Sequence, residues 1–189
     1  MRWLVSAVLF LVILSGCAYK DSSLLIQPYK ADFIHITQKP EKIYIKNIID
    51  ERENRGIIAI ITDSQGDNYG YETSDTNFIK WYEDALKKAL ELNGYEIVNS
   101  SCKADETIEL RIEKILSTFD RSNLTKANLF GDIKLSLTIE KGTQTITKEI
   151  SEHIKSYTPI IADKEDFINQ IEILLNDSIK MIVKGLDED

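Results

Sequence analysis

Apolar and polar residues alternate along much of this chain with the period of a β-strand. In such a stretch every second side chain is apolar, so one face of the strand is dry and the other is wet. A short, unbroken apolar run at 57–61 is typical of a strand buried on both faces. The predicted strands cover residues 42–49, 57–61, 95–98, 105–119, 129–139 and 144–156.

Two stretches instead show the three- and four-residue spacing of an amphipathic helix. In residues 76–93 the apolar stripe includes Phe78 and Tyr82. Ser74 or Asp75 is expected to cap the start of this helix, because short polar side chains accept a hydrogen bond from the first turn. Gly94 follows its end, where a residue with positive φ is favoured.

The second helix is predicted to begin after Asp163 and to end at Gly185. Asp166 stands at the spacing of a capping box, although Glu or Gln is the usual residue there. The apolar face includes Phe167, Ile171 and other residues at helical spacing.

A phase change within 105–119 predicts an irregular strand. The apolar positions are even-numbered up to Ile112 and odd-numbered from Ile115. Since a slip of one residue moves every side chain to the other face, we expect a β-bulge near Lys114.

The two strands that follow are predicted to form a hairpin. A two-residue loop at Lys141-Gly142 would place Leu137 opposite Ile146 and Ile133 opposite Ile150, with glycine in the turn. Charged residues interrupt the apolar face of the second strand at Lys148 and Glu152, which predicts an edge position for it.

These elements predict an α+β fold, in which an antiparallel sheet of about five to six strands carries two amphipathic helices on one face. Residues 50–56 and 62–74 are predicted loops. The first, with Asp50, Glu51 and Glu53, is expected to be an exposed charged turn. The second contains Tyr69 and Tyr71, which either contact a partner or simply cover the sheet.

The first residues have the pattern of a secretory signal. Arg2 precedes an apolar run, 3–14, that is too short to span a bilayer comfortably and ends in small residues. The motif Leu14-Ser15-Gly16-Cys17 resembles the lipobox of bacterial lipoproteins. That resemblance implies cleavage between Gly16 and Cys17 and attachment of acyl chains such as palmitate to Cys17. The predicted organisation is a signal peptide at 1–16, a lipidated tether at 17–40 and a single α+β domain at 41–189.

Charge and the residue after the lipidated cysteine bear on location. The net charge of −8 becomes −9 when Arg2 is removed with the signal. An acidic chain is a poor candidate for nucleic acid or for anionic lipid surfaces, so its membrane contact is expected through the acyl chains alone. Under the sorting rule of enterobacteria-like lipoproteins, Ala18 favours the outer membrane, at its periplasmic face. The inner membrane remains the alternative.

Candidate chemistry is sparse. The two histidines, His35 and His153, show no ligand spacing, and His153 is expected at the surface. No catalytic triad, phosphate-binding loop or paired-cysteine motif is present. With Cys17 acylated, Cys102 has no disulfide partner within the chain; we interpret it as a small, half-buried filler, with a mixed disulfide or a reactive site as the alternative. These observations predict no enzyme activity, no cofactor and no metal.

The order of the elements resembles the YajG-like family of bacterial lipoproteins over residues 40–185. The resemblance rests on Ile43–Arg52, on Leu92-Asn93-Gly94-Tyr95 and on the Phe167–Ile182 helix. It implies the same architecture and an envelope location, and related small modules occur in other envelope lipoproteins. We therefore expect a non-enzymatic module that binds an envelope protein. The alternative is a lipid- or glycan-handling protein with an apolar cleft between helices and sheet.

Overall fold

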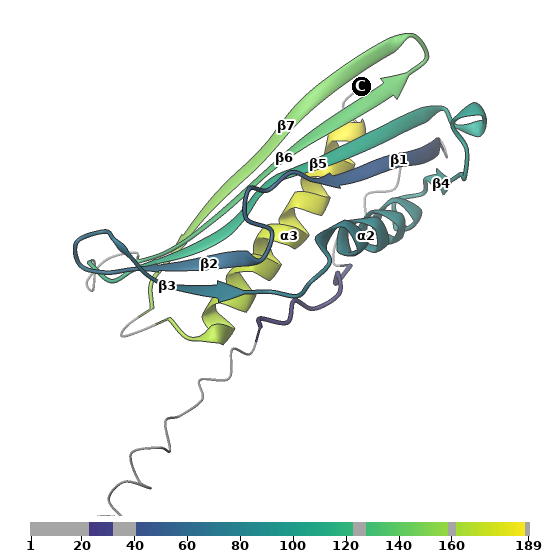
Figure 1. The fold of residues 1–189 in the computed structure, drawn as a ribbon. Coiled ribbons are helices and arrows are strands. Elements are labelled where there is room, and N and C mark those ends of the chain that lie inside the picture. Colours follow the sequence, from purple (N-terminus) through teal and green to yellow (C-terminus); the bar gives the residue numbers. More distant parts are fainter. Residues whose placement is uncertain (1–22, 32–40, 123–127, 159–161, 188–189) are drawn as a thin grey trace, which may run out of the picture.

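The computed structural model describes residues 23–31, 41–122, 128–158 and 162–187 (Figure 1). Gly16, Cys17 and His35 lie outside the described residues, so the structure does not test the predictions made for them. Among the described helices, none is long and apolar enough to cross a membrane.

Seven strands form one sheet, and both helices lie against the same face of it (Figure 1). In chain order the elements are β1 (Lys42–Asp50), β2 (Ile57–Thr62), β3 (Asn68–Thr73), α2 (Phe78–Leu92), β4 (Glu96–Ile97), the 3₁₀ turn η1 (Ser101–Lys103), β5 (Glu106–Asp120), β6 (Leu129–Lys141), β7 (Gln144–Ser156) and α3 (Lys164–Asp187).

The long strand β5 lies at the centre of the sheet. On one side it pairs with β6, which pairs in turn with β7, and both pairings are antiparallel. On the other side β1 and then β2 run parallel to β5, one after the other. Outside them, β3 is antiparallel to β2 and β4 is parallel to β1.

The prediction of an antiparallel sheet with five to six strands is therefore wrong in strand number and in part of the strand direction. The α+β class and the two helices are confirmed. The direction was missed because alternation of side chains is the same in parallel and antiparallel strands. The parallel pairs arise because α2 lies between β1 and β5 in the chain, and such a crossover returns the chain in the same direction.

The strand β3 was predicted to be part of a loop. The strand was missed because turn-forming residues dominate the pattern of 62–68. Asp63 does act in a turn, since its carboxylate accepts hydrogen bonds from the backbone N–H groups of Gln65 and Asp67. Pairing with β2 then makes a strand of the remainder. Gly70 faces Ile61, where a Cβ would meet the Ile61 side chain at 3.7 Å.

The bulge expected near Lys114 is confirmed, since the register between β5 and β6 shifts between Ile112 and Lys114. The hairpin of β6 and β7 is also confirmed, but the predicted register is wrong. The turn residues are Gly142 and Thr143, and Ile139 rather than Leu137 lies opposite Ile146.

Turn chemistry explains the difference in register. Gly142 has a φ of +61°, whereas no residue other than glycine has a positive φ among the described residues. This fits a two-residue turn of type II′, which needs glycine at its first central position. Since the predicted pairing is shifted by two residues, the predicted apolar face stays the same. The edge position of β7 is confirmed.

The helix ends agree in part with the sequence prediction. Gly94 has a φ of +91°, as expected after the end of α2. The N-cap of α2 is Asn77, whose side chain accepts the N–H of Lys80 at 3.0 Å, and not Ser74 or Asp75. The Ser74 hydroxyl instead donates to the carbonyl of Leu24 at 2.7 Å.

The last helix, α3, begins as predicted and ends later than predicted. Asp163 and Asp166 form a reciprocal capping box, in which each carboxylate accepts the backbone N–H of the other residue. The helix continues through Gly185, so glycine does not end it. The Lys148 ammonium donates to the Gly185 carbonyl at 2.7 Å, which gives the inward-facing charge of β7 a partner at the helix end.

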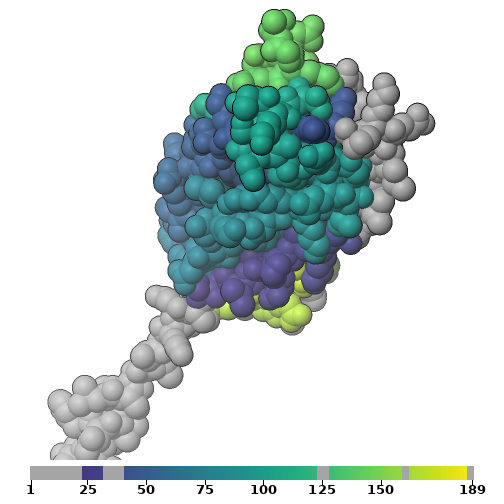
Figure 2. Space-filling model, turned by 90° about the vertical axis from the view of Figure 1, so that its right-hand side faces the viewer, coloured from purple at the N-terminus to yellow at the C-terminus, as the bar shows by residue number. Residues whose placement is uncertain are grey.

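The N-terminal segment 23–31 packs on α2 and is visible as the purple band on the surface in Figure 2. Leu24, Ile26 and Tyr29 are buried in the core, whereas Leu25 points outward. The indole N–H of Trp81 donates to the carbonyl of Gln27 at 2.8 Å. The segment that leads toward Cys17 is therefore attached to the domain from residue 23 onward.

A buried ion pair fills the break between β1 and β2. The guanidinium of Arg52 donates to both carboxylate oxygens of Asp50, at 2.9 and 2.8 Å, and lies 4.6 Å from the centre of the Phe78 ring. Both charged side chains are buried, so the prediction of an exposed charged turn is wrong for these two residues. Burial alone would raise the pKa of Asp50, but the hydrogen bonds and charge of Arg52 outweigh it and hold the pKa below its ordinary value.

Replacement of Leu24 by alanine tests the attachment of the N-terminal segment. Leu24 is 2% exposed and Leu25 is 70% exposed. We expect Leu24→Ala to lower the free energy of unfolding by about 2–4 kcal/mol through lost burial and a cavity. The control Leu25→Ala should change it by less than about 0.5 kcal/mol. Denaturant titration of the full chain in detergent measures both; equal effects would contradict the packing.

The Asp50–Arg52 pair makes the stability of the folded chain depend on pH in the acidic range. Because the pKa of Asp50 is lower in the folded chain, its stabilising contribution is complete above the unfolded carboxyl pKa of about 3.9 and is lost as the pH falls through the folded value. We expect Asp50→Asn to cost about 3–5 kcal/mol at neutral pH, since it leaves Arg52 buried without its partner.

The difference between Asp50→Asn and the wild type should shrink below about pH 4, where the wild type also loses the charge. The control Glu51→Gln removes an exposed carboxylate that pairs with Arg111, and it should cost less than about 1 kcal/mol. A constant difference between Asp50→Asn and the wild type down to pH 2 would refute this account of the pair.

Candidate functional site

The outer edge of β1 is open along most of its length among the described residues. β4 contains only two residues, Glu96 and Ile97, which lie beside Lys42 and Ile43. The chain then leaves the sheet after the N–H of Val98 has bonded to the carbonyl of Ile43 at 3.0 Å. The rest of β1 therefore has β5 on one side and no described strand on the other.

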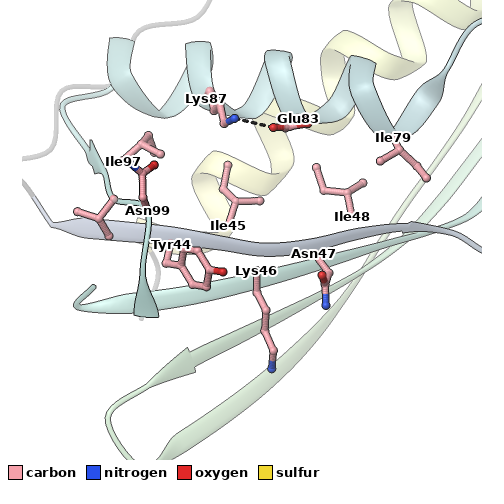
Figure 3. Close-up of a pocket in the computed structure, with 11 residues that line it drawn as sticks. Tyr44, Ile45, Lys46, Asn47, Ile48, Ile79, Glu83, Lys87, Ile97 and Asn99 are labelled. Carbon is pink, nitrogen blue, oxygen red and sulfur yellow. Dashed lines mark hydrogen bonds and ion pairs between the residues drawn. The ribbon is translucent and has the colours of Figure 1, made fainter. Parts of the chain in front are cut away.

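A groove runs between this open edge and α2 (Figure 3). We call it the β1 groove, and its volume is about 350 Å³. Its apolar lining comes from both β1 and α2 and from the end of β4, and its main members are Ile45, Ile48, Ile79 and Ile97, with Glu83 and Lys87 at the rim.

A bulge places two isoleucines in the groove. The register of β1 against β5 shifts between Ile45 and Asn47, so Ile45 and Ile48 both point toward α2 (Figure 3). Lys46 points the other way, and its ammonium pairs with Glu140 at 2.9 Å. The lysine charge at this edge is therefore directed away from the groove.

The rim of the β1 groove carries one positive and one negative side chain, whose charges cancel. The ammonium of Lys87 lies 2.6 Å from the carboxylate of Glu83, one turn earlier on α2 (Figure 3). The hydrogen bond and charge of Lys87 hold the pKa of Glu83 below its usual range, so the Glu83 carboxylate is charged at neutral pH. The groove thus offers apolar contact and open backbone groups, with no net charge.

A second depression lies on the face of the sheet that the helices leave uncovered. We call it the Tyr71 hollow; its volume is about 480 Å³, and Ile57, Ile60, Tyr71, Leu116, Lys114 and Lys134 line it. Lys114 pairs with Asp132, and Lys134 pairs with Glu113 and Glu149. Tyr69 and Tyr71 are both exposed, and Tyr71 lines the hollow.

The structure corrects or confirms the chemical predictions one by one. Cys102 is exposed, so its interpretation as a half-buried filler is wrong; it sits in the short turn η1, which provides no layer to cover it. Its sulfur lies 2.8 Å from the hydroxyl of Ser100. His153 is at the surface as predicted and bonds Asp132 through Nδ1 at 2.7 Å.

The described residues contain no group of three or more His, Cys, Asp or Glu side chains arranged to hold a metal ion. Sequence reasoning did not single out the β1 groove. The alternation in 42–49 predicts only a strand position for Ile45, and the pattern gives Ile79 no special role. The groove exists because β4 ends at Ile97, whereas the apolar Val98 extends the predicted strand to residue 98.

Comparisons with known proteins support the fold and a family. A Xanthomonas campestris protein of the family DUF330 has a crystal structure with a TM-score of 0.60; it is 11% identical, and the match covers 84% of this chain and 92% of that one. A second crystal structure, of a protein described as uncharacterized, has a TM-score of 0.55 and 9% identity, over 86% of this chain and 99% of that one. These low identities show a shared fold alone.

No curated protein matches the chain. The model of the family Lipoprotein_16, described as uncharacterized lipoprotein, matches residues 36–185, which include every described strand, α2, all but the last two residues of α3, and the β1 groove. The chain therefore belongs to this lipoprotein family, which is the YajG family that its sequence resembles.

Proposed function

We propose that this protein is a bacterial lipoprotein held at the periplasmic face of the outer membrane by acyl chains on Cys17. Its folded domain serves as a non-enzymatic binding module for an envelope protein. The β1 groove is the observation that supports partner binding, because it combines an open strand edge with isoleucine side chains from both walls. Such edges are established sites for protein association.

Three features support the anchoring part of the proposal. The lipobox-like motif ends at Cys17, Ala18 follows it, and the family is one of lipoproteins.

The distance between the proposed anchor at Cys17 and the folded domain is short. Ser23, where the described N-terminal segment begins, is six residues beyond Cys17, and six residue steps span roughly 20–22 Å at most at about 3.3–3.6 Å each. A partner would meet the domain close to the membrane.

The charge pattern favours contact over catalysis. Glu83 and Lys87 form an ion pair at the rim of the β1 groove, and Lys114 and Lys134 of the Tyr71 hollow also pair with carboxylates. A paired carboxylate with a lowered pKa, such as Glu83, is a poor general acid at neutral pH. The Tyr71 hollow presents mostly apolar side chains to another molecule, and the β1 groove presents isoleucines together with polar groups.

The Tyr71 hollow supports the second candidate, a lipid- or glycan-binding auxiliary lipoprotein. Its lining is mostly apolar, and the exposed ring of Tyr71 is an amphipathic surface of the kind that contacts such ligands. It lies away from the helices, whereas the sequence suggested a cleft between helices and sheet. That interface holds the buried core. Lipid or glycan that co-purifies with the full chain, and is lost with Tyr71→Ala, would favour this candidate.

Replacement of each cysteine by serine tests the anchor. Cells fed a palmitate analogue should label the wild type and Cys102→Ser equally and leave Cys17→Ser unlabelled. Cys17→Ser should also be lost from the washed membrane fraction, since acyl chains supply the membrane affinity at about 0.8 kcal/mol per buried methylene. Cys102 is the matched control, because it is the other cysteine of the chain and is exposed.

Separation of the two membranes by density tests the location. The labelled wild type should sediment with the outer membrane, and Ala18→Asp should move it to the inner membrane. Label on Cys17→Ser, or the same membrane association for that variant as for the wild type, would overturn the anchor.

A further inference from the structure

We propose that the β1 groove receives an extended segment of the partner protein, which joins the sheet as a further strand beside β1. This inference rests on the proposed function and names the kind of partner. The segment has aliphatic side chains at alternating positions and little net charge where it binds.

The short strand β4 already occupies the beginning of the path that such a segment would follow. Glu96 and Ile97 run beside the first residues of β1, and the chain turns away after Val98. The carbonyls of Glu41 and Ile43 face β4, whereas the carbonyl of Lys42 accepts from Asp105 on the β5 side. Because backbone groups alternate along a strand, those of Ile45 face the open edge.

The other two outer strands lack a comparable groove. β7 carries Lys148 and Glu152 on its helix-facing side, and inward-pointing charges of this kind discourage further pairing. At the end of β3 the N–H of Leu24 already bonds to the carbonyl of Thr73 at 2.7 Å. Among the outer strands that the structure describes, only β1 has an open edge beside a groove that a helix closes on its far side.

The groove also determines which side chains an added strand would carry. Every second side chain of that strand would point toward α2 and contact Ile45, Ile48 and Ile79. A volume of about 350 Å³ is near the lower limit of the roughly 300–1,000 Å³ found for small-molecule sites, so it suits one or two aliphatic side chains. The intervening side chains would lie on the polar face with Tyr44 and Asn47.

Two features restrict the binding to a short, specific segment. The bulge at Lys46 interrupts the open edge, so a long, regular strand cannot pair along all of β1. The rim pair of Glu83 and Lys87 is neutral, so neither a strongly acidic nor a strongly basic segment gains from it. A second copy of this chain is disfavoured by its net charge of −8, since two acidic copies repel each other.

Photo-crosslinking in the cells that make the protein tests the proposal. Benzoylphenylalanine replaces Ile79 in the groove, Leu92 on the same helix as the matched control, and Tyr71 in the hollow. Ile79 and Leu92 are 40% and 42% exposed, so each tolerates the probe. We expect crosslinks from Ile79, mapped by mass spectrometry, to fall within one short segment with alternating aliphatic residues, and few from Leu92.

A synthetic peptide copy of that segment then tests strand addition directly. When it binds the full chain in detergent, hydrogen exchange at the Ile45 amide should slow. Ile79→Asp should weaken peptide binding by about tenfold or more, because it places a charge beside Ile45 and Ile48, whereas Leu92→Asp should change it by less than about twofold.

Three outcomes would overturn the inference. Crosslinks from Ile79 to β1 of another copy would identify the groove as a self-association site. Unchanged exchange at Ile45 with the peptide bound would exclude strand addition. A partner crosslinked by the probe at Tyr71 and not by the probe at Ile79 would refute the role of the groove and leave the proposed function standing. If neither probe crosslinked a partner, the result would count against the groove and against the proposed function.

Discussion

The need to pair both edges of β5 governs this structure. Buried backbone groups must find hydrogen-bond partners, and β5 is a strand of 15 residues. β6 pairs along one edge of β5, but the other edge is shared by β1 and β2, which meet at a break. Asp50 and Arg52 fill that break with a buried ion pair, and Arg52 packs on Phe78 at the start of α2. The pair therefore holds together the sheet and the helix that form the two walls of the β1 groove.

Much of the fold could be predicted because it depends on local pattern. The helices, the long strands, the bulge near Lys114 and the capping box at Asp163 all follow from spacing or from single side chains. Strand direction, the strand at 68–73 and the hairpin register depend on contacts between distant segments or on the backbone angle of one glycine, Gly142. Burial of Arg52 could not be foreseen, since its charged neighbours gave the pattern of an exposed turn.

The candidate site was hidden from sequence reasoning for a different reason. Ile45 and Ile48 have the pattern of ordinary core residues, and nothing in that pattern shows that a neighbouring strand is missing. The groove arises where β4 ends after two residues. An absence of pairing is a property of the assembled sheet, so only the structure could reveal it. The exposed Tyr69 and Tyr71, in contrast, were already candidates for contact from their sequence alone.

The attached N-terminal segment links the proposed anchor to the β1 groove. Leu24 bonds to Thr73 at the end of β3 and to Ser74, just before α2. Ile79 lies in the first turn of that same helix, so one end of the groove is close to the point where the chain arrives from Cys17. If acyl chains hold Cys17 in the membrane, this packing fixes the orientation of the groove relative to the anchor. A partner in the same membrane could then present a short extended segment to β1 without searching through all orientations of a freely tethered domain, and this reduces the entropic cost of association.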